Sequence, residues 1–285
     1  MYKLVAIDLD GTLLTDDLMI SPNTVTAIKK AVEAGTVVTI ATGRMFSSAK
    51  LIALQLGINV PLITYQGALI KDVNENEVIY ERTVPPEIAQ KLIEISREKK
   101  LHLQIYQDDI LYSAIENDKL IAYSETVKVP YRIEPNLIKL AQKGVTKLLF
   151  IEEPIVLDHL QNELQTLFGK YAHIAKSKKH YLEITHPEAN KGTALLCLAK
   201  RLGIDRSEII GIGDNYNDID LIETAGLGIA MGNAVKKVKD KADYTTFTNN
   251  EEGVLHVFEK FILESVNTSD DDDIEEKNSD SLPTA

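Results

Sequence analysis

The chain has 285 residues, of which 44% are hydrophobic and 26% charged, and its formal net charge is -12. This is the composition of an ordinary globular protein, and domains cluster at about 100 to 150 residues, so the length favours two domains. The acidic balance argues against a nucleic-acid polymer or an anionic membrane as partner, and no apolar run reaches the roughly 18 residues of a membrane span. Cys197 is the only cysteine, which excludes an internal disulfide framework and favours a cytoplasmic location.

The first predicted element is a strand over Leu4 to Ile7. A short run of branched apolar residues that ends in a turn is typical of a buried strand in a parallel sheet. Asp8 and Asp10 follow at its carboxyl end, just before Gly11. Side chains two residues apart on an extended backbone point the same way, so both carboxylates face one crevice, at the edge where open α/β sheets bind ligands. Two acids in that place need a cation or a proton.

The next stretch alternates helices and strands, which predicts a parallel sheet. Ser21-Pro22 is typical of a helix start and Gly35 of a helix end. The predicted elements are a helix over Pro22–Ala34, a strand over Val37–Ala41, a helical segment that ends at Gly57, and a strand over Leu62–Tyr65. Residues 73–84 interrupt this alternation of helices and strands, because they predict a polar turn between short strands. Two prolines follow.

Residues 86–187 differ in character and predict an inserted α+β domain. The predicted elements are a helix over Glu87–Lys99, a hairpin over Leu103–Ala114, a strand over Lys147–Ile151, a helix over Leu157–Phe168 and a strand pair around Lys178. From Lys191 the alternation of helices and strands resumes, so we expect residues 1–85 and 188–265 to form one split α/β domain. The segment 266–285 has almost nothing to bury, and its last 19 residues contain seven acidic residues and one lysine. We expect this tail to be disordered.

Further polar residues stand where predicted strands end or helices begin. Thr42-Gly43 offers a hydroxyl and a backbone N–H, which together favour an anion. Lys191 opens a helix, and Asp214 and Asp218 follow the strand over Ile209–Ile212. Four carboxylates at one sheet edge, counting Asp8 and Asp10, would not all stay ionised without a counter-charge. A hard divalent ion answers that need, and Mg²⁺ typically takes one or two carboxylates plus waters and substrate phosphate.

At these residues the sequence resembles the haloacid dehalogenase superfamily of aspartyl phosphotransferases. Within that superfamily it is most similar to the Cof-type branch of sugar-phosphatase-like hydrolases. The resemblance covers nearly everything up to about residue 265, and four motifs in the right order carry it. They are Asp8-Leu9-Asp10-Gly11-Thr12-Leu13-Leu14, Ala41-Thr42-Gly43-Arg44, Lys191-Gly192, and Gly213-Asp214 to Asp218. The resemblance implies an α/β fold with a Rossmann-like core and a mobile cap of the large α/β type, here residues 86–187.

The resemblance also implies a mechanism. Asp8 would attack phosphorus to form an aspartyl-phosphate, while Asp10 protonates the leaving oxygen and later activates water. The single cofactor would be Mg²⁺, held by Asp8, the backbone carbonyl of Asp10, and Asp214. Asp218 would either bind the ion or orient Lys191 or a water on the ion. The phosphoryl oxygens would be bound by the backbone of Leu9 and by Thr42, Gly43, Lys191 and Asn217.

Some of these residues also have a simpler, structural interpretation. An Asp-x-Asp pair after a strand is often a solvated turn or a helix cap, and Asp218 has a second interpretation as an acid of a first helical turn. Arg44 either binds substrate or caps surface structure. Gln66 departs from the family pattern, which has asparagine there, so contacts to the hinge or the substrate stay open. The acidic tail also lies outside the pattern.

Together these features predict a cytoplasmic, monomeric, Mg²⁺-dependent phosphatase. Its substrates would be small phosphomonoesters, namely sugar phosphates, nucleoside monophosphates or phosphorylated cofactors. Two alternatives remain: a sensor of phosphorylated metabolites with weak turnover, and a phosphomutase or phosphotransferase that uses the same intermediate. No feature of residues 86–187 identifies the substrate.

Overall fold

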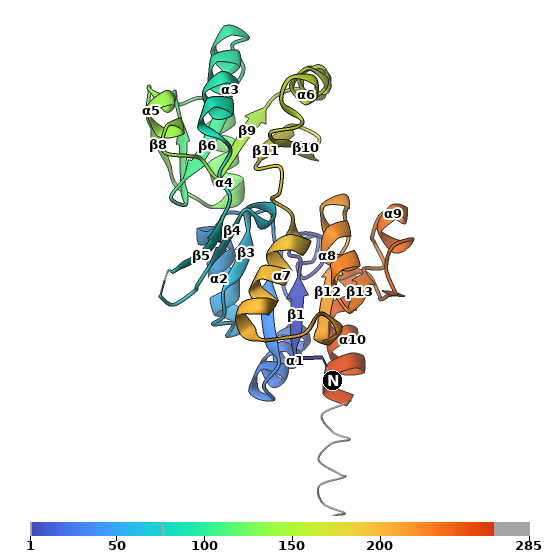
Figure 1. Cartoon of the computed structure of the whole chain (residues 1–285). Coiled ribbons are helices and arrows are strands. Elements are labelled where there is room, and N and C mark those ends of the chain that lie inside the picture. Colours follow the sequence, from blue (N-terminus) through green and yellow to red (C-terminus); the bar gives the residue numbers. More distant parts are fainter. Residues whose placement is uncertain (1, 76, 265–285) are drawn as a thin grey trace, which may run out of the picture. The chain divides into compact units, whose positions relative to one another are not determined.

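The structure is a computed structural model that describes residues 2–75 and 77–264 (Figure 1). The predicted tail at 266–285 lies outside the described residues. The described residues form two compact units. The parallel-sheet unit contains residues 1–41, 53–60 and 195–285, as far as they are described, and the antiparallel-sheet unit contains 42–52 and 61–194. This division differs from the predicted insert at 86–187, whose boundaries stay a prediction.

The parallel-sheet unit is built on five strands in the order β14-β13-β12-β1-β2. They are β1 (Leu4–Ile7), β2 (Val37–Ile40), β12 (Ile209–Gly213), β13 (Leu227–Ala230) and β14 (Tyr244–Thr245). Every pairing among them is parallel, with Leu4 opposite both Ile209 and Val37. All four residues of β1 are buried. The predicted α/β class and the buried first strand are therefore confirmed.

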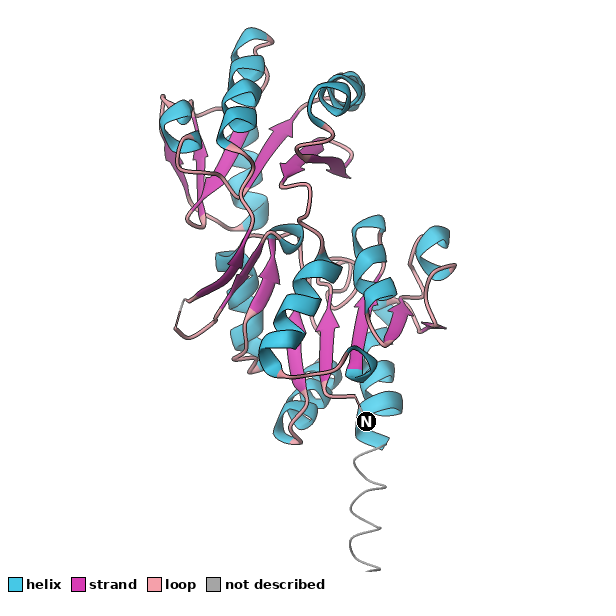
Figure 2. Ribbon diagram, in the orientation of Figure 1, coloured by secondary structure: helices cyan, strands magenta, loops and turns pink. Residues whose placement is uncertain are grey.

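Helices of the parallel-sheet unit follow the strands as alternation requires (Figure 2). The helices are α1 (Pro22–Glu33), α7 (Lys191–Leu202, whose first turn belongs to the other unit), α8 (Ile219–Thr224), α9 (Lys236–Lys239) and α10 (Gly253–Phe258), the π-helical η5 (Glu259–Leu263), and the 3-10 turns η2 (Arg206–Glu208), η3 (Tyr216–Asp218) and η4 (Asn249–Glu251). The start of α1 is as predicted, because Ser21 Oγ accepts the N–H of Thr24 at 3.1 Å. No helix in the described part of the chain is long and apolar enough to cross a membrane.

The antiparallel-sheet unit contains a six-stranded sheet in the order β10-β11-β9-β6-β7-β8, in which only β7 and β8 pair in parallel. Its strands are β6 (Leu103–Gln107), β7 (Ile110–Ser113), β8 (Tyr131–Ile133), β9 (Lys147–Ile151), β10 (His173–Lys178) and β11 (Tyr181–Thr185). Its helices are α3 (Pro86–Glu98), α4 (Asp118–Val127), α5 (Leu137–Ala141) and α6 (Pro154–Phe168). Side chains of α3, α5 and α6 share one apolar core with Ile105, Leu148 and Leu182 from the sheet. The predicted hairpin and strand pair are both present.

One prediction is wrong in detail. The strand at 62–65 was expected in the parallel sheet, but β3 (Leu62–Thr64) pairs antiparallel with β4 (Leu69–Lys71), which pairs with β5 (Val78–Glu81). The antiparallel pairing follows from the turn η1 (Tyr65–Gly67), where Tyr65, Gln66 and Gly67 have φ angles of 51°, 60° and 90°. This run of left-handed residues reverses the chain at once, so the next strand, β4, returns antiparallel beside β3. The helix before β3 is α2 (Phe46–Leu56).

Candidate functional site

Three carboxylates gather at the carboxyl end of the parallel sheet. The N–H of Asp8 donates to Ile212 O at 3.0 Å, so β1 and β12 remain paired up to the first aspartate. Carboxylate oxygens of Asp8, Asp214 and Asp218 all lie within 4.8 Å of one another. Asp8 is 5% exposed and Asp218 is fully buried, whereas Asp10 is exposed. Three buried or half-buried carboxylates this close need a counter-charge, and a hard cation with oxygen ligands provides one.

Gly11 allows the loop after β1 to approach Asp214. Its φ of +84° is a conformation that residues with a side chain rarely adopt, and a Cβ atom there would lie 2.6 Å from Asp214 Oδ2. The hydroxyl of the next residue, Thr12, donates to Asp214 Oδ1 at 3.0 Å and is buried. Sequence reasoning missed Thr12, although its position directly after Gly11 was the available signal. The loop therefore fixes the orientation of the Asp214 carboxylate.

Asp218 has two roles in this geometry. Its Oδ2 accepts the N–H groups of Asp214 and Asn215, each at 3.0 Å, so it caps the turn that follows β12. The alternative interpretation of Asp218 as an acid of a first helical turn is thus supported. Its carboxylate nevertheless belongs to the cluster with Asp8 and Asp214. By holding the backbone of Asp214, Asp218 positions that residue as well as adding charge.

Two asparagines that sequence reasoning did not identify support the loop after β1. Asn233 Nδ2 donates to Gly11 O at 2.8 Å, and Asn249 Nδ2 donates to Leu14 O at 3.0 Å. The two are joined, because Asn249 N donates to Asn233 Oδ1 at 3.0 Å. Since both come from the far end of the chain, no local pattern marks them. Asn249 from η4 and Asn233 from the segment after β13 thus hold the carbonyl groups of the loop after β1 in place.

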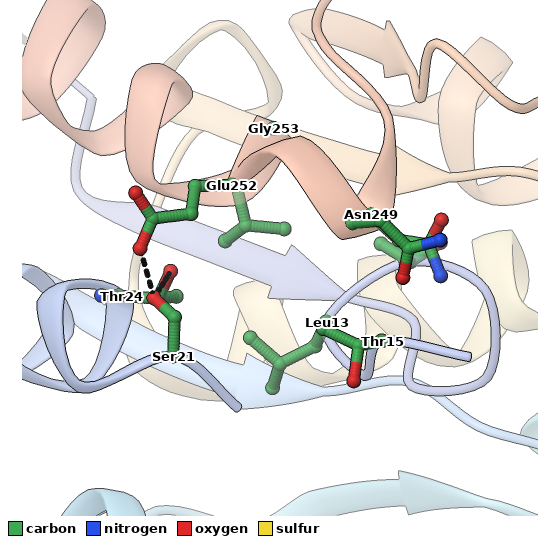
Figure 3. Close-up of a pocket in the computed structure, with 10 residues that line it drawn as sticks. Leu13, Thr15, Ser21, Thr24, Asn249, Glu252 and Gly253 are labelled. Atoms are coloured by element: carbon green, nitrogen blue, oxygen red, sulfur yellow. Dashed lines mark hydrogen bonds between the residues drawn. The ribbon is translucent and has the colours of Figure 1, made fainter. Parts of the chain in front are cut away.

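A small cavity of about 50 Å³ lies beside this support (Figure 3). It is lined by the loop after β1, the start of α1 and the residues from Asn249 to Val254, and Ser21 donates a hydrogen bond to Glu252 across it. The cavity shares Thr12 with the aspartate site but includes none of the three clustered carboxylates. It therefore belongs to the packing that supports the loop.

The second motif lies in the antiparallel-sheet unit, against η1. Thr42 N donates to Ile63 O at 2.9 Å, and Gln66 N donates to Thr42 O at 3.1 Å. The Thr42 hydroxyl accepts the N–H of Arg44 at 3.1 Å. A Cβ atom on Gly43 would lie 2.3 Å from Gln66 Nε2, so the Gln66 side chain covers this glycine. The residue that departs from the family pattern thus contacts the predicted phosphate-binding segment.

Lys191 also lies near η1. It is the first residue of α7 and is fully buried, and Asn190 Oδ1 caps the helix by accepting the N–H of Thr193 at 2.7 Å. A Cβ atom on Gly67 would lie 2.2 Å from Asn190 O, so the backbone of η1 contacts the residue before the lysine. The structure therefore places the second and third motifs against the same short turn.

Asp109 occupies the helix start that follows the second motif. Its carboxylate accepts the N–H groups of Phe46 and Ser47 at 2.9 and 2.8 Å, and the hydroxyl of Tyr65 at 2.8 Å. Burial and the Asp109 charge raise the pKa of Tyr65 well above its ordinary value, so this hydroxyl stays a donor. The Asp109 carboxylate therefore occupies two N–H groups of this helix start that an anion would otherwise bind. Sequence reasoning saw Asp109 only as part of a hairpin turn.

Comparisons with known proteins agree with the family resemblance predicted from the sequence. Residues 5–258 match the family described as haloacid dehalogenase-like hydrolase. The 5-amino-6-(5-phospho-D-ribitylamino)uracil phosphatase YwtE of Bacillus subtilis is 32% identical, over 91% of this chain and 98% of YwtE. The HMP-PP phosphatase of Serratia proteamaculans is 32% identical, over 84% of this chain and 87% of that protein. The crystal structure of TM0651 from Thermotoga maritima has a TM-score of 0.84 and 39% identity, covering 92% of this chain and 98% of TM0651.

Proposed function

The chain belongs to the haloacid dehalogenase-like hydrolases, and from this we propose that it is a Mg²⁺-dependent phosphatase that forms an aspartyl-phosphate on Asp8. Its relatives are named phosphatases, and two of them are named for small phosphorylated molecules. The class of activity is therefore hydrolysis of phosphoric monoesters. The observation that carries the finer proposal is the cluster of Asp8, Asp214 and Asp218 at the end of β1 and β12.

The residues of the cluster suit Mg²⁺. All the ligand atoms are oxygens, and the carboxylates of Asp214 and Asp218 are already oriented by hydrogen bonds with Thr12 and with the backbone of Asp214. We assign the ion to the carboxylates of Asp8 and Asp214 and to the backbone carbonyl of Asp10, with Asp218 supporting Asp214 or binding the ion directly. Bound there, Mg²⁺ would withdraw charge from the phosphoryl oxygens and so stabilise the transition state.

The two aspartates of the first motif divide the chemistry. A carboxylate oxygen of Asp8 forms a bond to phosphorus while the bond to the leaving oxygen breaks, and the Asp10 carboxyl donates its proton to that oxygen. Asp10 then takes a proton from water, whose oxygen attacks phosphorus and releases Asp8 and phosphate. The burial of Asp8 and the exposure of Asp10 support this division, because the nucleophile is shielded and the proton carrier reaches solvent.

We assign the phosphoryl oxygens to the backbone of Leu9 and to Thr42, Gly43, Lys191 and Asn217. Support comes from Lys191, since a fully buried ammonium is stable only beside anionic groups, and from Thr42-Gly43, which precedes a helix by a few residues. The substrates proposed are small phosphorylated metabolites, namely sugar phosphates, nucleoside monophosphates or phosphorylated cofactors. The cytoplasmic location and the monomeric state stay predictions.

An assay with p-nitrophenyl phosphate tests the proposal. We expect release of nitrophenol that requires Mg²⁺ and stops with EDTA, and we expect D8N and D10N to remove it while both variants stay folded. Turnover that persists in EDTA would contradict the role of the metal. Inorganic phosphate and product analysis, with a hydroxyl acceptor added, separate hydrolysis from phosphotransfer. Absence of turnover on a broad panel of phosphomonoesters would favour the sensor.

A further inference from the structure

The loop after β1 is a tight turn that the core anchors on one side. Leu13 N donates to Asp8 O at 3.2 Å and Leu14 N donates to Leu9 O at 2.9 Å, which closes the turn. The three leucine side chains of the turn are buried, whereas Asp10 is exposed. The leucines therefore fix the base of the turn, and the position of Asp10 depends on what holds the backbone at its tip.

The segment after β13 holds this tip. Asn233 Nδ2 donates to Gly11 O at 2.8 Å, and Gly11 directly follows Asp10. Two residues after Asn233, Val235 N donates to Asp214 O at 3.1 Å. One short segment thus fixes backbone carbonyl groups in both the first and the fourth motif.

Asn249 extends the support to the other end of the turn (Figure 3). Its side chain is buried, and its Nδ2 donates to Leu14 O at 3.0 Å and to Asp16 Oδ1 at 3.1 Å. Its backbone N–H donates to Asn233 Oδ1 at 3.0 Å, so the two asparagines orient each other. Both hydrogens of the buried Nδ2 group are used on this one loop, which fixes the orientation of the amide.

Asn250 and Asp16 complete the support on the exposed side. Asn250 Nδ2 donates to Asp16 Oδ2 at 2.9 Å, and Asp16 N donates back to Asn250 Oδ1 at 3.1 Å. The hydrogen bonds from Asn250 and Asn249 lower the pKa of Asp16, so its carboxylate remains an acceptor. The loop is therefore held at Gly11, Leu14 and Asp16 by residues 222 to 235 positions away in the chain.

We propose that Asn233 and Asn249 position the general acid, because they fix the loop that places the Asp10 carboxyl at the leaving oxygen. This inference rests on the proposed phosphatase function. Neither asparagine is assigned a contact with the reacting groups, and each acts through a backbone carbonyl group, Gly11 O or Leu14 O. A general acid must lie within hydrogen-bond reach of the oxygen that it protonates, and a misplacement of about 1 Å can cost about 10²-fold in rate.

The leaving group distinguishes this role from a structural one. An alkoxide is a strong base and needs the proton of Asp10 as it leaves, whereas p-nitrophenolate is a weak base and leaves without that proton. The ratio kcat/KM includes only the steps up to loss of the leaving group, so it isolates the step in which Asp10 acts as an acid. A displaced Asp10 should therefore lower kcat/KM for alkyl phosphates far more than for p-nitrophenyl phosphate.

The variants N233A and N249A, assayed at saturating Mg²⁺, test this role. The alkyl substrate is the best one among glycerol phosphate and the hexose phosphates. We expect each variant to lower kcat/KM about tenfold or more for the alkyl phosphate and less than about threefold for p-nitrophenyl phosphate. N162A, at an exposed asparagine of α6, is the matched control and should match the wild type on both substrates. Because Asn233 is exposed, N233A decides the question if N249A fails to fold.

The outcomes separate the two proposals. A wild-type protein that hydrolyses no phosphomonoester overturns the proposed function. A wild-type protein that hydrolyses p-nitrophenyl phosphate but no alkyl phosphate overturns only the positioning role, as do variants that match an active wild type. Equal losses on both kinds of substrate also overturn it, because the asparagines would then support the metal site or the fold and not the proton transfer.

Discussion

The two units both bury charged side chains, but they do so in opposite ways. In the parallel-sheet unit, Asp8, Asp214 and Asp218 have the same charge and stand in turns where strands end. In the antiparallel-sheet unit, Lys147 and Glu183 have opposite charges and stand on the face of a sheet. Like charges create a demand for a cation, whereas the charges of the mixed pair already balance each other.

This difference predicts how substitutions in each region affect the activity. A change in the aspartate cluster removes the cation site and should affect every substrate equally. A change in the balanced pair leaves the reacting groups intact and should affect only substrates that contact it. Substrate dependence of a kinetic defect is therefore the measurement that separates the two regions.

The largest effect is expected for D8N. The amide has no nucleophilic oxygen anion and loses one unit of the charge that attracts the cation, so kcat should fall at least about 10³-fold for every substrate. D205N is the matched control, because Asp205 is an exposed aspartate at the start of η2. Steady-state kinetics with p-nitrophenyl phosphate and one sugar phosphate measure the effect. A loss confined to one substrate would contradict the assignment of Asp8.

Gly11 allows a finer test of the same cluster. Gly11 and Gly35 both have a left-handed backbone, with φ of +84° and +93°, but a Cβ at Gly35 contacts nothing within 4 Å. Both G11A and G35A should lose about 1–2 kcal/mol of stability from backbone strain. Only G11A pushes against Asp214, so the Mg²⁺ concentration for half-maximal activity should rise about 10- to 100-fold in that variant alone. Equal Mg²⁺ titrations of the two variants would show that Gly11 serves only the turn.

Sequence patterns predicted the parts of the site that are local. The strand over Leu4 to Ile7 and the acids after it follow from one apolar run and one turn, and Ser21 marks a helix start by residue type alone. The contacts of Asp109, Lys147 and Glu183 join segments far apart along the chain, and no spacing encodes them. The misplaced strand over Leu62 to Thr64 has a related cause, because the reversal at Tyr65 and Gln66 uses residues that rarely adopt positive φ.

Asp109 tests how the second motif is held. Its carboxylate binds two N–H groups at the start of α2 and the Tyr65 hydroxyl, so D109N should lower the free energy of unfolding by about 1–2 kcal/mol. Asp108 is the matched control, since it is the neighbouring turn residue, has a similar φ and is exposed. Urea unfolding of D109N and D108N measures the difference. Equal stabilities would mean that the carboxylate charge does not support this helix start.

The smallest effect concerns His102, a buried residue that directly precedes β6. Its Nδ1 is 2.9 Å from Asn117 Nδ2, and Asn117 Oδ1 accepts the N–H of Leu120, so the amide nitrogen is the donor and Nδ1 the acceptor. Burial, reinforced by the Lys119 charge, lowers the pKa of His102 to about 4. The unfolded chain, with the ordinary histidine pKa of about 6.5, therefore binds more protons than the folded chain between these two values.

Stability should accordingly fall as the pH drops from 7 to 5, by about 1–2 kcal/mol from this residue alone. H102Q removes the titrating group, so its free energy of unfolding should change less over the same pH range than that of the wild type, whatever its stability at pH 7. His159 on the exposed surface of α6 provides the substitution control, H159Q. Urea unfolding at pH 7 and pH 5 gives the comparison. If H102Q and the wild type lose the same stability, folding does not lower the pKa of His102, and burial does not keep this histidine neutral.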